Sequence, residues 1–267
     1  MKLHLFQFLL IILSFNLGNA YFPELRADAA SVDVDTLIGA IGLQKCVITC
    51  IDPLVDEIHK AMAMKNTIDN YPTLCAVFIN ASSCIEAAKC PGAARIYRIV
   101  TSGIENLCTR KQKYFERQHD CLKTHIDAKA NYCDKKCNYV NSIAKLSKNL
   151  EVKIYAKIGG SPLPMLTKIG EICESAHCFL PCFRDAMNSV CKRSGGIIVD
   201  GLLRPFHYLA AFLDESGPVV QRMLKNSIPK TCTYLTDENI LIQIRKGGKA
   251  AASSDMNSVV RMVQPNY

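Results

Sequence analysis

The sequence lacks the patterns that would point to a metal site, a membrane span or a sheet. None of its 14 cysteines forms a Cys-x-x-Cys pair, so the spacing typical of structural zinc sites is absent. No stretch shows sustained apolar–polar alternation, which argues against strands. No unbroken apolar run reaches the roughly 20 residues that a bilayer span needs. We therefore expect an all-α protein with no metal, no cofactor and no transmembrane anchor.

Motifs of hydrolytic enzymes are also missing. There is no Gly-x-Ser-x-Gly elbow, and the histidines follow no triad spacing. The run His119-Asp120-Cys121 is similar to the His–Asp pair of secreted phospholipases. However, the upstream cysteine pair and glycine-rich calcium loop of those enzymes do not precede it. The position of His119 on an apolar stripe predicts a packed or boundary histidine. We expect no enzymatic activity, and a degenerate phospholipase-like hydrolase is one alternative.

The first 20 residues are typical of a secretory signal. Lys2 is followed by an apolar segment over residues 5–17 and by small residues up to Ala20. The sequence thus predicts a secreted, extracellular protein whose mature chain begins at Tyr21. Nucleic acid is excluded as a partner, because no recognition motif is present and the chain leaves the cell.

Another long apolar stretch covers residues 196–213. It contains Asp200, Arg204 and His207, and burying these side chains in lipid would cost several kcal/mol. We interpret this stretch as a helix of the protein core.

Cysteine is the residue type that is abundant. All 14 cysteines lie after the signal segment, and an even number in a secreted chain predicts disulfides rather than reactive thiols. The candidate disulfide residues are Cys46, Cys50, Cys75, Cys84, Cys90, Cys108, Cys121, Cys133, Cys137, Cys173, Cys178, Cys182, Cys191 and Cys232.

Apolar residues recur at intervals of three and four along most of the mature chain, which predicts amphipathic helices. We expect helices over residues 47–62, 71–89 and 111–148, a further one from about 166 to Pro181, and shorter ones near 199–213 and 219–225. Pro53 either kinks or breaks the first of these. Residues 246–267, rich in Gly, Ala, Ser and Asn, are expected to form a flexible tail.

Three cysteine pairs share a Cys-x-x-x-Cys spacing. Helical residues four apart have Cβ atoms about 5–6 Å apart, whereas a disulfide requires roughly 3.5–4.5 Å. Each pair should therefore bond to a partner helix, and two pairs on antiparallel helices would form two parallel rungs. For the pairs at 46/50, 133/137 and 178/182, we expect the rungs to be Cys46–Cys137 and Cys50–Cys133.

The order of these cysteines resembles the cysteine-rich domain of nematode chondroitin proteoglycan 4 proteins. The resemblance rests on Lys45-Cys46-x-x-x-Cys50-Ile51-Asp52-Pro53-Leu54, Cys75, Cys84, Cys90, Thr101-Ser102-Gly103-Ile104, Cys108, Cys121 and Cys133-x-x-x-Cys137. It extends to Cys178-x-x-x-Cys182, Cys191, Leu202-Leu203-Arg204-Pro205 and Pro229-Lys230-Thr231-Cys232.

The helical periodicity and the cysteine pairs predict a disulfide-stapled helical bundle or array, and the resemblance implies an extracellular matrix or binding protein without catalysis. We divide the chain into a signal (1–20), a lead-in (21–42), the cysteine-rich helical domain (43–149), a helical extension packed on it (150–245) and the tail (246–267). Some family members carry chondroitin on Ser-Gly sites. The first alternative function is that of a secreted carrier of an apolar ligand, enclosed by the stapled helices, and the hydrolase is the second.

Sites of attachment and binding are few. Only three Ser-Gly dipeptides occur, at Ser102, Ser194 and Ser216, and only Ser216 follows acidic residues, so it is the candidate glycosaminoglycan acceptor. Asn80 lies in the only N-glycosylation sequon. The net charge is +8, and the excess concentrates between residues 109 and 148. We expect an anionic polysaccharide or the extracellular matrix as partner, with the candidate contacts Arg110, Lys111, Lys113, Arg117, Lys135 and Lys136.

Overall fold

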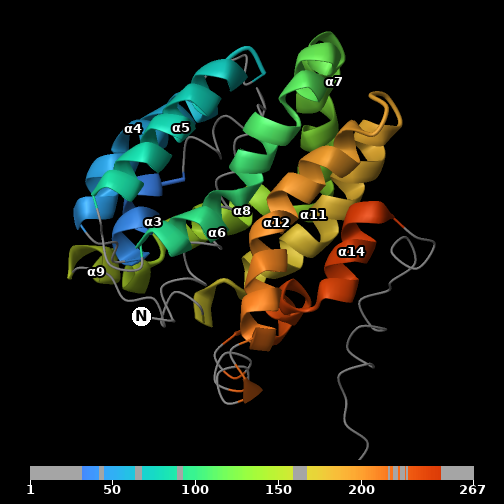
Figure 1. Ribbon diagram of the computed structural model, residues 1–267. Coiled ribbons are helices and arrows are strands. Elements are labelled where there is room, and N and C mark those ends of the chain that lie inside the picture. The colour runs from blue at the N-terminus through green and yellow to red at the C-terminus, as the bar shows by residue number, and fades with distance from the viewer. Residues whose placement is uncertain are drawn as a thin grey trace, which may run out of the picture.

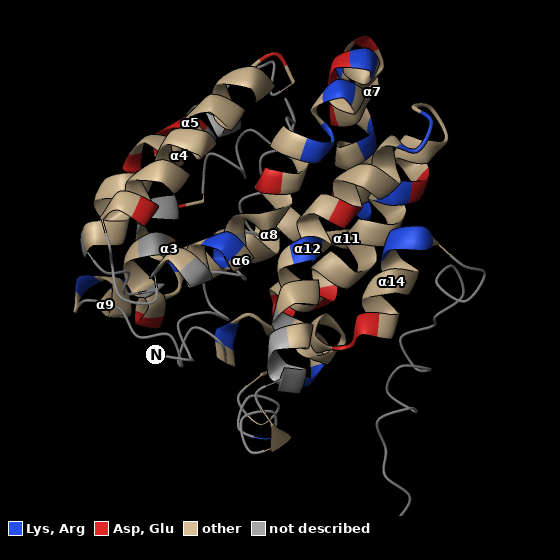
Figure 2. Ribbon diagram, viewed as in Figure 1, with Lys and Arg blue, Asp and Glu red and all other residues tan. Residues whose placement is uncertain are grey.

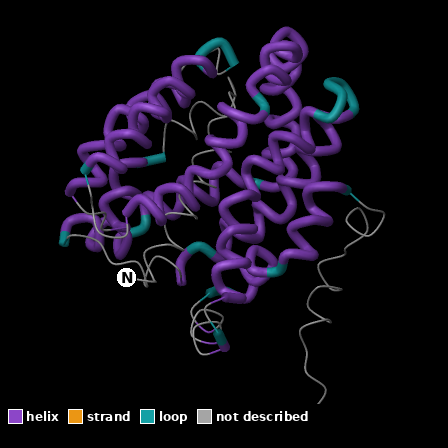
Figure 3. Tube along the Cα trace, viewed as in Figure 1, coloured by secondary structure: helices purple, strands orange, loops and turns teal. Residues whose placement is uncertain are grey.

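The computed structural model describes residues 32–41, 45–63, 68–88, 93–158, 167–215 and 228–247, with a few isolated positions between 217 and 226. Throughout these ranges the regular structure is helical and no strand occurs (Figure 1 and Figure 3). The all-α prediction is confirmed. The first elements are α3 (Val34–Ile41), α4 (Lys45–Ala63), α5 (Tyr71–Ala87), α6 (Ala93–Glu105) and η1 (Asn106–Arg110). They are followed by α7 (Gln112–Cys137), α8 (Tyr139–Lys148), α9 (Leu150–Lys157), α11 (Gly170–Asn188), α12 (Ser194–Glu215), η2 (Lys230–Thr236) and α14 (Glu238–Lys246).

Two groups of helices each enclose a hydrophobic core. Helices α4, α5 and α6 with η1 surround the first core, which includes Leu54 and Phe78. The second, larger core is formed by α3, α7, α8, α9, α11, α12, η2 and α14 and includes Phe179 and Phe206. Figure 1 shows α4 and α5 on one side of the molecule and α11, α12 and α14 on the other. The domain division at residue 149 stays a prediction; α7 and α8, which precede it, share the second core with helices that follow it.

Six disulfides link the described helices to one another. Two lie in the first group and four in the second, and their Cα–Cα distances are 5.0–5.9 Å. These distances fall within the normal range for the bond. The pairs are Cys50–Cys84, Cys75–Cys108, Cys121–Cys191, Cys133–Cys182, Cys137–Cys178 and Cys173–Cys232.

The expected pairing of Cys46 with Cys137 and of Cys50 with Cys133 is wrong. Two antiparallel rungs do exist, but they join α7 to α11 through Cys133–Cys182 and Cys137–Cys178. Cys50 bonds to Cys84 instead, because α4 packs on α5 rather than on α7. The spacing therefore correctly predicted two parallel disulfides between antiparallel helices, but it assigned them to the wrong pair of helices.

The long helix expected over residues 111–148 is interrupted at Asn138. This residue has φ 57° and ψ 35°, the left-handed conformation that asparagine tolerates better than most residues. The buried carboxylate of Asp134 accepts a hydrogen bond from the Val140 amide at 2.8 Å, so it caps the start of α8. A local polar interaction thus ends one helix and begins the next without breaking the apolar stripe.

Two helices continue past an internal proline. Pro53 lies inside α4, which continues through it. Pro181 lies inside α11, so the prediction that this helix ends there is wrong. Its neighbours Cys178 and Cys182 are both bonded to α7. These bonds hold the helix on both sides of a residue that costs it a backbone hydrogen bond.

Helix α12 is the apolar segment that was interpreted as a core helix. It buries Val199, Leu202, Leu203 and Phe206 in the second core. It is longer than expected and runs as one element from residue 194 to 215. Among the described residues, no helix combines the length and the apolar character required to cross a bilayer.

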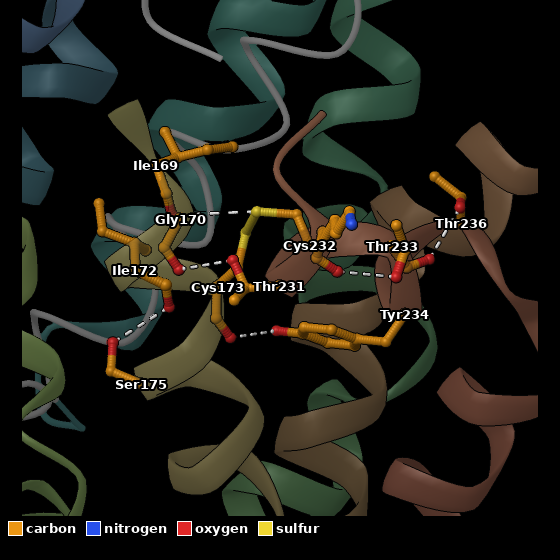
Figure 4. The surroundings of a disulfide bond; sticks show 11 residues. Ile169, Gly170, Ile172, Cys173, Ser175, Thr231, Cys232, Thr233, Tyr234 and Thr236 are labelled. Carbon is orange, nitrogen blue, oxygen red and sulfur yellow. Dashed lines mark hydrogen bonds between the residues drawn. A yellow bond between two sulfur atoms is a disulfide. The ribbon is translucent and has the colours of Figure 1, made fainter. Parts of the chain in front are cut away.

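The C-terminal elements dock onto α11 through a disulfide and several backbone contacts. Figure 4 shows Cys173 bonded to Cys232, with the Tyr234 hydroxyl donating to the Cys173 carbonyl at 2.9 Å. The buried Arg184 donates to the carbonyls of Gln243 and Ile244 near the end of α14. These contacts complete the second core with residues that lie far along the chain from α7.

Candidate anion-binding surface

The six cations selected from the sequence are mostly exposed. Lys111 is half-buried, and the other five are exposed, as a solvent-facing side of α7 requires. They form two groups, since Arg110, Lys111, Lys113 and Arg117 lie at the start of α7 and the other two in its last turn. At 1.5 Å per residue, Lys113 and Lys135 are about 33 Å apart along the axis. The structure therefore does not bring all six into one patch.

Two further cations join the group at the start of α7. Lys192 and Arg193 are exposed on the short connection between α11 and α12. The Tyr114 hydroxyl of α7 donates to the Lys192 carbonyl at 2.5 Å. Figure 2 shows blue segments both at the upper end of α7 and on this connection beside it. The sequence interpretation missed these two residues; the signal available was a Lys-Arg pair directly after Cys191.

Arg117 on α7 and Arg193 on the α11–α12 connection both lie near the Tyr114 hydroxyl. Burial raises the pKa of Tyr114, and the positive charges of Arg193 and Arg117 act in the opposite direction. Both guanidinium groups are therefore close enough to influence the same oxygen atom. We call Lys113, Arg117, Lys192 and Arg193 the cation cluster.

The basic side chains of the described residues differ in whether they pair with a carboxylate. Within the described part of the chain, no carboxylate lies within ion-pair distance of the four members of the cation cluster, nor of Arg110 or Lys111. Elsewhere, by contrast, ion pairs are formed by Lys123–Asp69 (2.8 Å), Lys145–Glu171 (3.3 Å), Lys168–Glu151 (3.1 Å) and Arg245–Asp200 (2.9 Å).

The acids nearest in sequence to the cluster have other partners. Glu116 accepts a hydrogen bond from Gln112 at 2.9 Å. Its charge, together with burial as the larger effect, raises the pKa of Tyr71 on α5 to about 12. Asp120 lies 3.1 Å from the His119 ring. Neither acid therefore forms an ion pair with a member of the cluster.

His119 is a boundary residue that links α7 to the segment before α5. Its Nε2 lies 2.8 Å from Asp69 and its Nδ1 lies 3.1 Å from Asp120. Lys123 contacts the other Asp69 oxygen at 2.8 Å. Hydrogen bonds from Lys123 and, to a smaller extent, from His119 lower the pKa of Asp69. Both imidazole nitrogens of His119 therefore contact carboxylates.

Two of the three Ser-Gly dipeptides are part of the packing. Ser102 is 4% exposed and Ser194 is fully buried. A Cβ atom on Gly103 would lie 2.1 Å from the Gly201 carbonyl oxygen, and one on Gly195 would lie 2.1 Å from that of Arg184. These glycines permit close helix contacts, and their serines are closed to a modifying enzyme. Ser216 lies outside the described residues.

The remaining predicted sites have different positions. Asn80 is exposed on α5, as the helical geometry of its sequon predicts. Cys46 is also disulfide-bonded. The signal segment, Cys90 and residues 248–267 lie outside the described part of the chain.

The cysteine order and the stapled helices can now be compared with known proteins. A model of the family described as Chondroitin proteoglycan 4 matches residues 35–259. The chain belongs to this family. The match covers both cores and the cation cluster, and it confirms the resemblance inferred from the cysteines.

Two family relatives come from nematodes. The chain is 20% identical over 264 residues to Chondroitin proteoglycan 4 of Caenorhabditis elegans, covering 78% of this chain and 33% of that protein. It is 20% identical over 259 residues to the Caenorhabditis briggsae protein of the same name, covering 77% and 38%. The chain thus spans about a third of the length of these relatives. No solved structure matches it.

Proposed function

We propose that this protein is a secreted, non-catalytic component or ligand of the extracellular matrix that binds anionic polysaccharide. The observation that carries the proposal is the cation cluster, whose four exposed members form no ion pair with a described carboxylate. Anionic polysaccharides present repeating sulfate or carboxylate groups, and exposed arginine and lysine side chains bind such groups by charge-assisted hydrogen bonds. Membership of a family named for chondroitin proteoglycans supports this choice of polyanion.

The Ser-Gly positions favour binding over covalent attachment. Ser102 and Ser194 are buried, and each is followed by a glycine that a helix contact requires. Ser216 stays the candidate acceptor for a glycosaminoglycan chain. Chondroitinase treatment of the protein secreted by a eukaryotic host, followed by gel electrophoresis, tests this point. Unchanged mobility would remove Ser216 as an acceptor and leave non-covalent binding as the proposed function.

Retention on immobilised chondroitin sulfate and heparin tests the binding function. We expect the folded protein to be retained at low salt and released as salt rises, because exposed charges are screened over about 8–10 Å at physiological ionic strength. A cytochrome or other basic protein of similar net charge serves as the control for unspecific retention. Passage of the folded protein through both columns at low salt would contradict the proposed function.

We also propose that Asn80 carries an N-glycan in the secreted protein. The residue is exposed on α5, while the sequon residue Ser82 is half-buried and donates to the Phe78 carbonyl at 2.9 Å. Because this hydroxyl is engaged in the folded helix, the glycan would be added before α5 packs. Digestion with an N-glycosidase should increase gel mobility, and Asn80→Gln should abolish that change. Equal mobility before and after digestion would contradict the assignment.

A further inference from the structure

The start of α7 and the connection between α11 and α12 are joined by two independent contacts. The first is the hydrogen bond from the Tyr114 hydroxyl to the Lys192 carbonyl. The second is the disulfide between Cys121, two helical turns further along α7, and Cys191. The two contacts hold consecutive residues of the connection, Cys191 and Lys192, against α7. The backbone segments that carry these cations, which are more than 70 residues apart in sequence, are consequently held side by side.

The backbone at Arg193 has a conformation that an arginine rarely adopts. Its φ is 64°, in the left-handed region, which disfavours residues with a Cβ atom. The conformation is held by the Ser194 amide and hydroxyl, which both donate to the Cys191 carbonyl at 3.0 and 2.7 Å. A glycine would fit this position better. An arginine there costs stability, and such strained positions concentrate at binding sites.

The charges of the cluster also oppose folding. Helix α7 begins without an acidic residue in its first turn, although acids are favoured at the positive end of the helix dipole. Lys113 stands in that turn instead. Arg117 and Arg193 approach the same hydroxyl without an intervening described carboxylate. The backbone strain at Arg193 and the repulsion between the unpaired positive charges thus occur at the same place. An anionic ligand would relieve the repulsion.

We propose that Lys113, Arg117, Lys192 and Arg193 form one rigid, two-segment binding site for a sulfated or carboxylated polysaccharide chain, kept in shape by the Cys121–Cys191 disulfide. The inference rests on the proposed function and adds to it the location of the site and its dependence on a fixed geometry. A linear polyanion would cross from α7 to the α11–α12 connection and contact both segments. The cations in the last turn of α7 are not part of this site.

A matched pair of charge variants tests the location. The first variant changes the four cluster residues to glutamine. The control variant changes four exposed cations outside the cluster to glutamine, namely Lys136, Lys148, Lys153 and Lys157, and so has the same net charge. Affinity for chondroitin sulfate and heparin is measured by retention and by calorimetry on full-length protein whose circular dichroism matches wild type.

We expect the cluster variant to lose about tenfold or more in affinity and the control variant to lose about threefold or less, because only the first loses direct contacts. Equal losses would overturn the site while leaving the binding function in place. Absence of wild-type binding would instead overturn the proposed function itself. The two failures are therefore distinguishable.

Arg193→Gly distinguishes a binding role of Arg193 from a purely structural one. Glycine relieves the left-handed strain, so the unfolding midpoint should rise, while the lost cation should lower affinity. Tyr114→Phe keeps all charges and removes one contact that positions the connection, so it should weaken binding without changing the net charge. Wild-type affinity in both variants would overturn the fixed two-segment site.

Discussion

The two disulfide rungs between α7 and α11 predict a specific pattern of stability. Cys133–Cys182 and Cys137–Cys178 close loops of 49 and 41 residues. They are only four residues apart on each helix. Once one rung has formed, the other closes a ring of about eight residues, for which the chain-entropy relation gives about 2.5 kcal/mol. Replacing either pair by alanine should therefore lower the free energy of unfolding by about 2–3 kcal/mol.

Removal of both rungs should cost more than twice the single loss. When both rungs are absent, Cys121–Cys191 is the neighbouring cross-link. The first rung to form then closes a ring of about 21 residues, made of the segments between Cys121 and Cys133 and between Cys182 and Cys191, and is worth about 3.3 kcal/mol. The double removal should thus cost about 6 kcal/mol. Cys133 is fully buried, so alanine is preferred to serine, which would bury an unsatisfied hydroxyl.

Urea unfolding under non-reducing conditions, followed by far-UV circular dichroism, measures these differences. Peptide mapping of the unreduced wild-type protein provides the control, since it must recover the peptide of Cys133 linked to that of Cys182. The slopes of the urea transitions must be compared as well, because a cross-link changes the compactness of the unfolded chain. Equal unfolding free energies for the single-rung and double-rung variants would refute the reasoning.

Three further predictions concern packing and pH. Asn106 is 2% exposed and its amide atoms have no hydrogen-bond partner among the described residues, so Asn106→Leu should stabilise the protein by about 1 kcal/mol in urea unfolding; a loss would indicate a bound water. Gly103→Ala places a Cβ atom 2.1 Å from the Gly201 carbonyl oxygen and should cost about 3 kcal/mol or more; wild-type stability would contradict the close crossing of α6 and α12. Burial raises the pKa of Asp127 to about 7, so its contribution to stability is fully present below pH 3.8 and is lost as pH rises toward 7. Asp127→Asn should accordingly be more stable than wild type at pH 8 but not at pH 4, and a difference independent of pH would contradict the raised pKa.

The helices were predictable because their buried faces are regular. In α5, for instance, Cys75, Phe78, Ala81 and Ile85 are buried at intervals of three or four residues, which is the pattern that the periodicity identifies. The interruption at Asn138 was not predictable in this way, because the apolar stripe continues through it. It depends on a side-chain contact from Asp134 to the next helix.

The disulfide partners could not be derived from spacing alone. All three Cys-x-x-x-Cys pairs satisfy the same local geometry, so the sequence allows several antiparallel ladders. The choice depends on which helices pack together, and that is decided by long-range burial. Helix α11 packs against α7 and α8, and its buried Phe179 stacks on Tyr139 of α8 with ring centroids 5.3 Å apart.

Only two of the four residues of the cation cluster could be selected from the sequence. Lys113 and Arg117 stand out in a basic segment, whereas Lys192 and Arg193 belong to a short connection far along the chain. Their approach follows from the Cys121–Cys191 bond, and no periodic pattern reports such a contact. Conversely, the lysines in the last turn of α7 could not be distinguished from the other candidate cations in the sequence. The length of α7 places them far from the start of the helix.

The distribution of disulfides places the proposed site within one covalently closed unit. Each of the six disulfides whose two cysteines are described joins elements of the same core, and non-covalent contacts between the described residues join the two cores. Those contacts include the crossing at Gly103 and the stacking of Tyr71 of α5 on Phe115 of α7, with ring centroids 5.1 Å apart. All four residues of the cation cluster lie on elements of the second core. Its geometry therefore depends on the α7–α11 disulfides and on Cys121–Cys191, and the first core contributes to it only through the interface with α12 and α7.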